Sequence, residues 1–567
     1  MKMKGLKFAI IALAAVVLAS CGGVEKMKEL PAGFTFKVTP NPMEVHGNKV
    51  KATIEGAIPA KYFNKKAIVE ITPVIVYKGG ELALPIKTLQ GEDVQANNQV
   101  INYEAGGSWK HDVEFDYKDE MFRCELELRF VITYKDKKVP FDAPQKAGIG
   151  TLATYKLVDI DPKPIMMKDK FVRITPEQKE AQINFVIQKS DIRKSELTKE
   201  ELKVLNDFLL AATQAKNKEV KEIRVSAYAS PDGPEKLNEK LSQERGKNTD
   251  KYLADVFKKA KVENKTAATV ETTTEDWDGF QKAVQASDVE DKELIIRVLS
   301  MYSDPEVREK EIKNLSKVYK VLAEKILPEL RRSKMIASVN NIGFSDDTLK
   351  YMVENNAYEN LNVEEMLYAA TLVSDVTKKI EVYMKAGEKF NCARGYNNAA
   401  YLHLMNKDAA AAKAALDKVP ADQKIPAVTN NRGCVALLEG NYDEAEKLFT
   451  EAADAGNEVK YNLGIIAIIK NQYPAAAEYF AGTDSFNQGL ALLLNAKVEA
   501  AKNTFAKVET AKGYYGRAIV GARLQEEATV LDNLRTAIGK DASLKDRAKD
   551  DVEFRNYFQN EAFKAIF

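Results

Sequence analysis

The chain has 567 residues, enough for three or four domains at the usual ~100 to 200 residues each. Its 84 Lys and Arg residues balance 83 Asp and Glu residues, so the net charge of +1 gives no bulk field to attract nucleic acid. The three histidines lie in unrelated segments without metal-ligand spacing, so we expect no metal site and no cofactor. Apart from Cys21, only Cys124, Cys392 and Cys434 remain, an odd number that excludes a disulfide framework as the source of stability. A Cys392–Cys434 bridge is the alternative to free cysteines packed in apolar helices.

The N-terminal residues have the pattern of an export signal. Lys2 and Lys4 give a positive start, and an apolar run from Phe8 to Leu18 follows, too short to span a bilayer as a stable anchor. The alternatives to a specialised signal are an ordinary cleaved signal and a short membrane helix. We predict that residues 1–20 form the signal.

The end of this signal, Leu18-Ala19-Ser20-Cys21, resembles the lipobox of bacterial lipoproteins. The resemblance implies that Cys21 becomes the mature N-terminus and carries acyl chains such as palmitate, which would hold the protein at a membrane. Residues 21–32 would then be a tether. Gly22 after the cysteine favours the outer membrane by resemblance to other lipoproteins, so we expect a periplasm-facing outer-membrane lipoprotein.

Residues 33–146 are dominated by alternation of apolar and polar side chains. The clearest run extends from Phe122 to Tyr134, with apolar residues at every even position. Short strands at regular spacing, separated by glycine-rich turns, predict a β-sandwich. Further strands are expected at Phe34–Val38, Val50–Ile54, Ile68–Tyr77, Leu82–Leu89 and Val113–Tyr117.

Residues 147–170 show little periodicity and contain Pro162 and Pro164, which indicates an interdomain linker. Strand and helix patterns then alternate over residues 171–345, as in a layered α/β sheet. The strands are expected at Ile183–Ile187 and Ile223–Tyr228, with a helix after each.

The stretch Ala227-Tyr228-Ala229-Ser230-Pro231-Asp232-Gly233, followed by Asn238, Leu241-Ser242 and Arg245, resembles the central motif of the OmpA-like C-terminal domain. Pro328-Glu329-Leu330-Arg331-Arg332, leading into Met335–Val339, resembles the final strand of that domain. The resemblance covers residues 183 to about 345, with a charged helical insertion at about 277–327. It implies a module that associates with peptidoglycan.

In that family an aspartate after the second strand and an arginine on the next helix bind the zwitterionic end of diaminopimelate. Arg245 has the matching arginine position, whereas Ser230 stands where the family has the aspartate. Asp232 and Asn238 complete the set of candidate peptidoglycan-binding residues. The alternative is structural: Ser230 and Asp232 would cap the following helix, and Arg245 would form an ion pair.

Residues 346–567 are helical and self-similar. The pair Asn397-Asn398 recurs as Asn430-Asn431. A glycine, an alanine and a phenylalanine recur with the same offsets in three sets, which are Gly433, Ala445 and Phe449; Gly464, Ala476 and Phe480; and Gly489, Ala501 and Phe505. These offsets resemble the tetratricopeptide (TPR) repeat, and they predict about six helical hairpins with a concave groove that binds protein partners. The alternative is a purely structural solenoid with no dedicated ligand.

The predicted protein is therefore a multidomain, non-catalytic, lipid-anchored envelope scaffold. Its parts are an N-terminal β-sandwich, a central OmpA-like α/β domain and a C-terminal all-α TPR-like solenoid. The alternative is an accessory lipoprotein of an envelope assembly or secretion complex whose OmpA-like domain no longer binds peptidoglycan. A cell-wall hydrolase would need paired carboxylates, a metal cluster or an activated nucleophile, and the sequence shows none with credible spacing.

Overall fold

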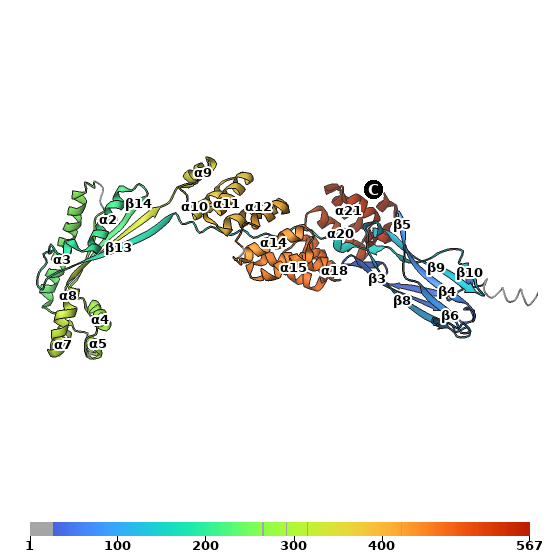
Figure 1. Cartoon of the computed structure of the whole chain (residues 1–567), viewed down its shortest axis with the longest axis horizontal. Helices are drawn as coiled ribbons and strands as arrows, with labels where there is room; N and C mark the ends of the chain where they lie inside the picture. The colour runs from blue at the N-terminus through green and yellow to red at the C-terminus, as the bar shows by residue number, and fades with distance from the viewer. Residues whose placement is uncertain (1–25, 263–265, 291, 315, 421) are drawn as a thin grey trace, which may run out of the picture. The chain divides into compact units, whose positions relative to one another are not determined.

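The computed structural model describes residues 26–262, 266–290, 292–314, 316–420 and 422–567 (Figure 1). The predicted signal and Cys21 lie outside the described residues. The chain divides into two units, one formed by Met1–Met167 with Tyr383–Phe567 and the other by Lys168–Val382. Each unit is described by itself below.

Two sheets form the N-terminal part of the first unit. One has the strand order β1-β3-β2-β12 with β8 also on β3, and the other has the order β10-β9-β4-β6-β7 with β11 on β9 and β5 on β4. The buried faces of the sheets pack together: a Cβ added to Gly148 would lie 3.8 Å from Val38 Cγ1 in the other sheet. The predicted β-rich N-terminal region is confirmed. The strands are β1 (Thr35–Thr39), β2 (Met43–His46), β3 (Lys49–Ile58), β4 (Ile68–Tyr77), β5 (Gly80–Ala83), β6 (Lys87–Gly91), β7 (Gln99–Ile101), β8 (Gly107–Asp116), β9 (Cys124–Tyr134), β10 (Lys137–Pro140), β11 (Gln145–Ile149) and β12 (Thr151–Leu152).

The strand pattern matches the alternation in the sequence. In β9 the even-numbered residues from Cys124 to Ile132 are buried, and those between them are exposed or half-buried. The strand begins at Cys124 because Asp119–Phe122 forms a 3-10 helix. The sandwich also extends past residue 146, where we placed its end, since β11 and β12 add to the two sheets and Thr154–Leu157 forms a further 3-10 helix.

The helical part of the first unit consists of consecutive hairpins. The first helix of each hairpin packs against the second through the repeated glycine and phenylalanine: a Cβ on Gly433 would lie 2.6 Å from the Phe449 ring, and one on Gly464 would lie 2.7 Å from the Phe480 ring. The predicted helical C-terminal region is confirmed. The helices are α12 (Ala393–Met405), α13 (Ala409–Leu416), α14 (Pro426–Leu438), α15 (Tyr442–Glu451), α16 (Asn457–Ile469), α17 (Tyr473–Tyr479), α18 (Phe486–Leu494), α19 (Val498–Phe505), α20 (Ala511–Leu524), α21 (Glu527–Lys540), α22 (Leu544–Asp550) and α23 (Glu561–Lys564).

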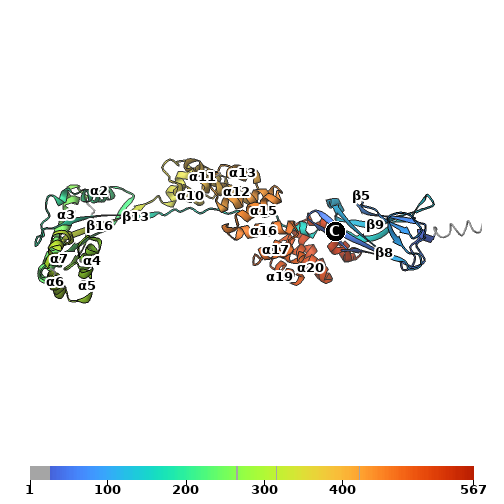
Figure 2. The ribbon, with the colours of Figure 1, turned by 60° about the horizontal axis from the view of Figure 1, so that its bottom comes forward.

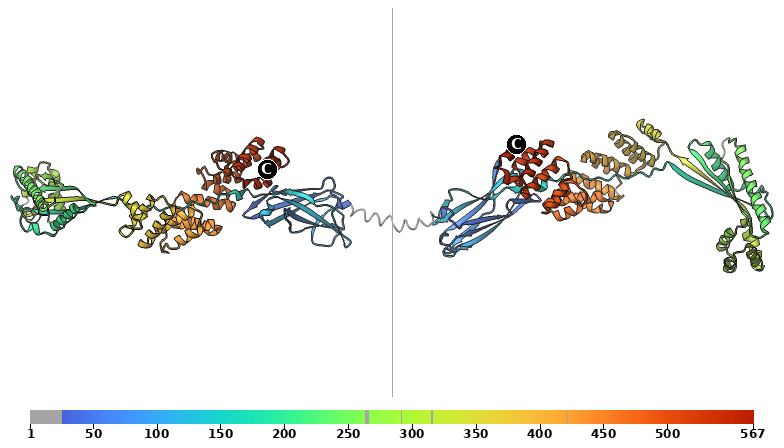
Figure 3. Two further views of the ribbon diagram at one scale, coloured as in Figure 1. Left: turned by 90° about the horizontal axis from the view of Figure 1, so that it is seen from above. Right: turned by 180° about the vertical axis from the view of Figure 1, so that it is seen from behind.

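The last helices pack against one end of the sandwich, red beside blue in Figure 3. The Thr154 hydroxyl donates to Glu553 Oε1 at 2.6 Å, and Arg523 Nη2 donates to the same oxygen at 2.6 Å. Glu553 is buried, so this charge is neutralised inside the contact. Gly150 lies so close to Val552 that a Cβ would approach Cγ2 to 2.4 Å. The sandwich and the repeats therefore form one body.

The second unit contains a four-stranded sheet of order β13-β16-β14-β15, in which only the β14–β15 pair is parallel. Helices α2 and α3 pack on the sheet around buried Ile183, Leu205, Val225 and Met335, and both helices are labelled in Figure 2. The elements are β13 (Ile174–Asn184), α2 (Glu200–Gln214), β14 (Lys218–Tyr228), α3 (Glu235–Lys259), β15 (Thr269–Thr273) and β16 (Arg332–Ile342).

The predicted helical insertion forms its own small core, which includes Phe280, Ile295, Leu322 and Leu327. Its helices lie between β15 and β16 in sequence. They are α4 (Trp277–Ala286), α5 (Lys292–Met301), α6 (Pro305–Asn314), α7 (Ser316–Val321), a π-helix (Leu322–Ile326) and α8 (Leu327–Leu330).

The end of the second unit differs from the boundary that we placed at residue 345. Helices α9 (Asp346–Glu354) and α10 (Val363–Leu372) and the start of α11 (Val376–Phe390) belong to this unit. The physical reason is local packing: the Phe171 ring stacks on Tyr368 at 4.5 Å, and Arg173 Nε donates to Phe344 O at 3.2 Å.

Candidate functional site

The segment predicted to be a linker lies against the helical repeats instead of running free. Residues 159–167, here called the strap, have no helix or strand. They contact six asparagines on the first helices of successive hairpins, here called the asparagine ladder. These side chains belong to residues that are at most 2% exposed: Asn397 and Asn398 on α12, Asn430 and Asn431 on α14, Asn462 on α16 and Asn487 on α18.

Four ladder asparagines each bind both main-chain groups of one strap residue. Asn431 accepts from the Ile165 N–H at 2.7 Å and donates to the Ile165 carbonyl at 2.9 Å. Asn462 does the same for Lys163, at 2.7 and 3.0 Å. A primary amide can do this because it offers one acceptor and two donors in one plane.

The same arrangement occurs at both ends of the strap. Asn487 accepts from the Asp159 N–H at 2.8 Å and donates to its carbonyl at 2.9 Å. Asn398 accepts from the Met167 N–H and donates to its carbonyl, both at 2.8 Å. The bonded residues are all odd-numbered, so the strap is held in the two-residue register of an extended chain.

The ladder asparagines also bond to one another. Asn431 Nδ2 donates to Asn397 Oδ1 at 2.9 Å, and Asn462 Nδ2 donates to Asn430 Oδ1 at 3.0 Å. These bonds fix the direction in which each amide points before it meets the strap. Buried amides without partners would be costly, and the ladder with its strap satisfies them.

Two strap residues add side-chain contacts with the repeats. Asp161 accepts from the Tyr461 hydroxyl at 3.0 Å, and burial raises the pKa of Tyr461, so this group stays a donor. At the start of the strap, Lys512 Nζ donates to the Leu157 carbonyl at 2.9 Å and forms an ion pair with Asp159. The repeats therefore present a cation and a hydroxyl to two acidic strap residues.

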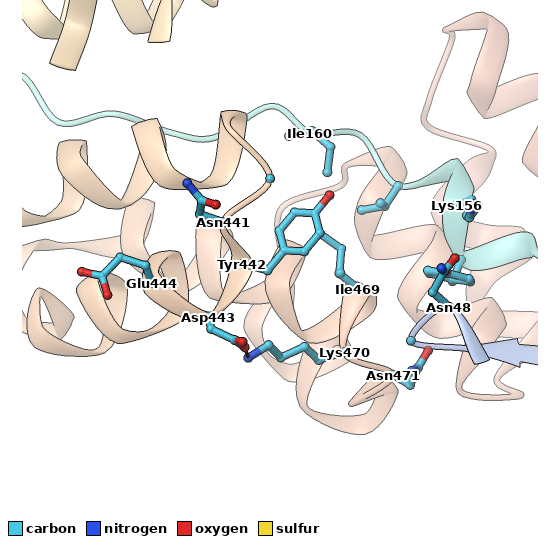
Figure 4. A pocket seen from close by; sticks show the side chains of 14 residues that line it. Asn48, Lys156, Ile160, Asn441, Tyr442, Asp443, Glu444, Ile469, Lys470 and Asn471 are labelled. Carbon is cyan, nitrogen blue, oxygen red and sulfur yellow. Dashed lines mark hydrogen bonds and ion pairs between the residues drawn. The ribbon is translucent and has the colours of Figure 1, made fainter. Parts of the chain in front are cut away.

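A cleft of about 1250 Å³ adjoins the strap within the same unit (Figure 4). Its lining includes Asn48 of the β2–β3 turn, Ile160 of the strap, Tyr442 at the start of α15 and Asn471 between α16 and α17. Lys470 on its wall is neutralised by Asp443 and by Glu446, 2.6 Å away.

In the second unit the structure brings Ser230 and Asp232 together beside Arg331. The Ser230 hydroxyl donates to Asp232 Oδ1, and Arg331 Nη2 donates to Asp232 Oδ2 at 2.9 Å. Arg331 Nε also donates to the Ser230 hydroxyl, at 3.2 Å. The Asp232 carboxylate is thus already paired with a cation.

Asn238 and Arg245 have internal partners as well. Asn238 Nδ2 donates to the Gly233 carbonyl at 2.9 Å, and Arg245 donates to the carbonyls of Lys189 and Tyr228 at 3.1 and 2.8 Å. Arg245 is 1% exposed, and burial lowers its pKa to about 10, so it stays protonated at neutral pH. It acts as a donor to main-chain carbonyls inside the domain.

The structural alternative for this cluster was wrong in its details. Pro234 stands at the N-cap of α3, and no side chain caps the helix there. Ser230 and Asp232 instead bind Arg331, and Arg245 binds carbonyls instead of a carboxylate. The contact of Ser230 and Asp232 with Arg331, the C-cap residue of α8, uses the side-chain oxygens that a cap would need.

Sequence reasoning missed the ladder as a binding surface. The paired asparagines indicate the repeat period in the sequence, and Asn462 and Asn487 continue the series on the next two hairpins. Asparagine at one position of successive buried helices is the signal, because a buried amide requires a partner. Arg331 lies in the motif that resembles a final strand, and nothing in that motif indicates its pairing with Asp232.

No protein-family model matches the chain, and comparison with curated proteins gives no significant match. Three solved structures are similar to part of it. "YrrB: a TPR protein with an unusual peptide-binding site" shares 24% identity over 29% of this chain and 94% of its own, with a TM-score of 0.25. A tetratricopeptide repeat protein from Parabacteroides merdae shares 14% identity over 39% of this chain and 89% of its own (TM-score 0.28). The pilF protein of Pseudomonas aeruginosa shares 15% identity over 37% of this chain and 97% of its own (TM-score 0.26).

The described residues suggest neither a membrane span nor a metal site. None of the described helices combines the length and apolar character that crossing a membrane requires. Within the same residues, no three His, Cys, Asp or Glu side chains are grouped as they would be around a metal ion.

Proposed function

We propose that this protein is a non-catalytic scaffold that is held at the outer membrane by lipid on Cys21 and that binds protein partners through its TPR-like repeats. The observation that supports this most is the asparagine ladder, which binds an extended protein main chain along four successive hairpins. Hydrogen bonds from side-chain amides to main-chain groups are a means of recognising an extended chain.

Lipid anchoring is tested on the protein from its native cells. Mass spectrometry of the N-terminal peptide should find Cys21 as the first residue with fatty acids attached. A chain that begins elsewhere, or that has an unmodified Cys21 thiol, would contradict the anchor. Extraction into detergent but not into high salt gives an independent check, because acyl chains are released by detergent and ionic contacts by salt.

The central domain allows two versions of this function. In the first, its OmpA-like motif associates with peptidoglycan. In the second, the domain has lost that affinity and docks onto proteins, as in an accessory lipoprotein of an assembly or secretion complex. The second version is favoured, because Asp232 is neutralised by Arg331, Arg245 is bound to carbonyls, and Ser230 has no charge to offer an ammonium group.

Sedimentation with purified peptidoglycan sacculi separates the two versions. The full-length protein in detergent is spun with sacculi, with and without excess free diaminopimelate. Failure to sediment supports the second version. Sedimentation that diaminopimelate abolishes supports the first, and release of soluble muropeptides would contradict a non-catalytic protein. The native chain is used because a change at the buried Arg245 would disturb the fold.

Partner binding is tested by crosslinking intact cells and identifying proteins attached to the first unit. The result expected is a specific protein crosslinked to the repeats. Crosslinks confined to lipid and to the protein itself would contradict a scaffold.

A further inference from the structure

The asparagine ladder recognises an extended main chain and not a particular set of side chains. Each bonded strap residue contributes only its N–H and carbonyl to the ladder, as Lys163 and Ile165 show. Such binding requires an N–H at positions 159, 163, 165 and 167 and an extended backbone, and it tolerates many side chains. The main-chain part of the site therefore fits any segment that meets these two conditions.

The strap sequence follows this rule. Pro162 and Pro164 have no N–H, and both lie at even positions, where the ladder binds nothing. Each proline also biases the residue before it toward the extended region, and those residues are Asp161 and Lys163. The prolines thus pre-form the bound conformation without removing a hydrogen bond.

The groove also selects charge at one end of the strap. Lys512 pairs with Asp159, and the Tyr461 hydroxyl donates to Asp161. Asn487 Nδ2 lies 3.3 Å from an Asp161 carboxylate oxygen as a second donor. Two acidic residues spaced by two, followed by prolines at alternate positions, therefore complement this groove.

We infer that the strap is a built-in ligand that occupies a peptide-binding groove, and that the partner of this groove is an extended segment of another protein with acidic residues two apart and prolines at alternate positions. This inference rests on the proposed function and names the class of partner. Because the strap belongs to the same chain as the groove, it competes with the partner at an effective concentration on the order of millimolar. Binding from outside is therefore weak until the strap leaves the groove.

A pair of proline substitutions tests this on the full-length protein. Ile165→Pro removes an N–H that donates to Asn431 and leaves every groove residue intact. Met166→Pro is the matched control, because position 166 is even-numbered like the native prolines at 162 and 164. Its N–H donates no hydrogen bond within the described residues. The probe is a fluorescent peptide with the sequence of residues 158–168.

The peptide should bind the Ile165→Pro protein about tenfold or more tightly than it binds the native or Met166→Pro protein, since loss of one main-chain bond frees the groove by that factor. A peptide of the same composition with its prolines moved to positions 163 and 165 should not bind. Tighter binding by Ile165→Pro together with this phase dependence supports the inference.

Three outcomes would overturn it. These are no binding to Ile165→Pro while its circular dichroism and melting match the control, equal binding of the phase-shifted peptide, and a strap-exchanged dimer that excludes free peptide. The last would make a second copy the occupant. If Ile165→Pro fails to fold, the test is whether excess peptide displaces the strap and binds the native protein. Binding supports the inference, and no binding overturns it. If partners crosslink to the native repeats but the peptide does not bind, the proposed scaffold function holds and this groove is not its binding site.

Discussion

Replacement of Asn431 by alanine should release the middle of the strap. The substitution removes both bonds to Ile165, at 2.7 and 2.9 Å, and leaves the Ile165 N–H without its acceptor. The Ile165 carbonyl keeps a bond from Asn397 at 2.9 Å, so it is not left unpaired. At about 1 kcal/mol for each net hydrogen bond and ~1 to 2 kcal/mol for the orphaned N–H, the strap loses about 3 to 4 kcal/mol.

Hydrogen exchange followed by mass spectrometry measures this loss directly. Because 1.4 kcal/mol is a factor of ten, the amides of Lys163, Ile165 and Met167 should exchange roughly 100 to 1000 times faster in Asn431→Ala. Asn406→Ala is the control: this exposed asparagine ends α12 and should change exchange little. Strap amides that exchange at the native rate in Asn431→Ala would refute the reasoning.

Three further predictions concern packing, titration and reactivity. Gly464→Ala places a Cβ 2.7 Å from the Phe480 ring and should lower the free energy of denaturant unfolding by ~1 to 3 kcal/mol. Gly539→Ala, with open space around it, is the control and should be neutral or stabilising. Equal effects of the two substitutions would contradict the hairpin contact. Burial raises the pKa of Asp551, so the stability that this carboxyl contributes is present at acid pH and is lost as pH rises above about 4. The stability of Asp551→Asn should therefore increase relative to that of the native protein between pH 4 and pH 7. A difference in stability that does not change with pH would argue against a buried titrating carboxyl. Burial raises the pKa of Cys124 to about 12 and also raises the pKa of Cys434, which lowers the reactivity of both thiols. Iodoacetamide should therefore label half-buried Cys392 first in the folded protein. Early labelling of Cys434 would show that its helix is open.

Local patterns were enough to predict the repeats and the strands of the sandwich. The glycine and phenylalanine offsets report contacts within one hairpin, where Gly433 on the first helix meets Phe449 on the second. Alternation along β9 reports a sheet with one buried face. Both signals arise from neighbours close in sequence.

The strap and the Asp232 cluster were beyond sequence reasoning for the opposite reason. Ile165 meets Asn431 across 266 residues, and Asp232 meets Arg331 across 99 residues. The sequence of residues 147–170 does not indicate which groups their main-chain N–H and carbonyl groups bind. A low-periodicity stretch with prolines is typical of free linkers. The sequence predicts a strand only from Ile183, whereas β13 begins at Ile174. Its first seven residues are mostly exposed and show no apolar alternation, and main-chain pairing to β16 holds them in the sheet.

Photo-crosslinking of the strap in the native chain tests the central claim most directly. Met166 and Met167 can be replaced by a diazirine analogue of methionine during expression, because they are natural methionines at the end of the strap. Ultraviolet irradiation should join them to α12 or α14 of the same chain, since Ile165 and Met167 are bound there by Asn431 and Asn398. Labels that react only with water would show that the strap does not occupy the groove.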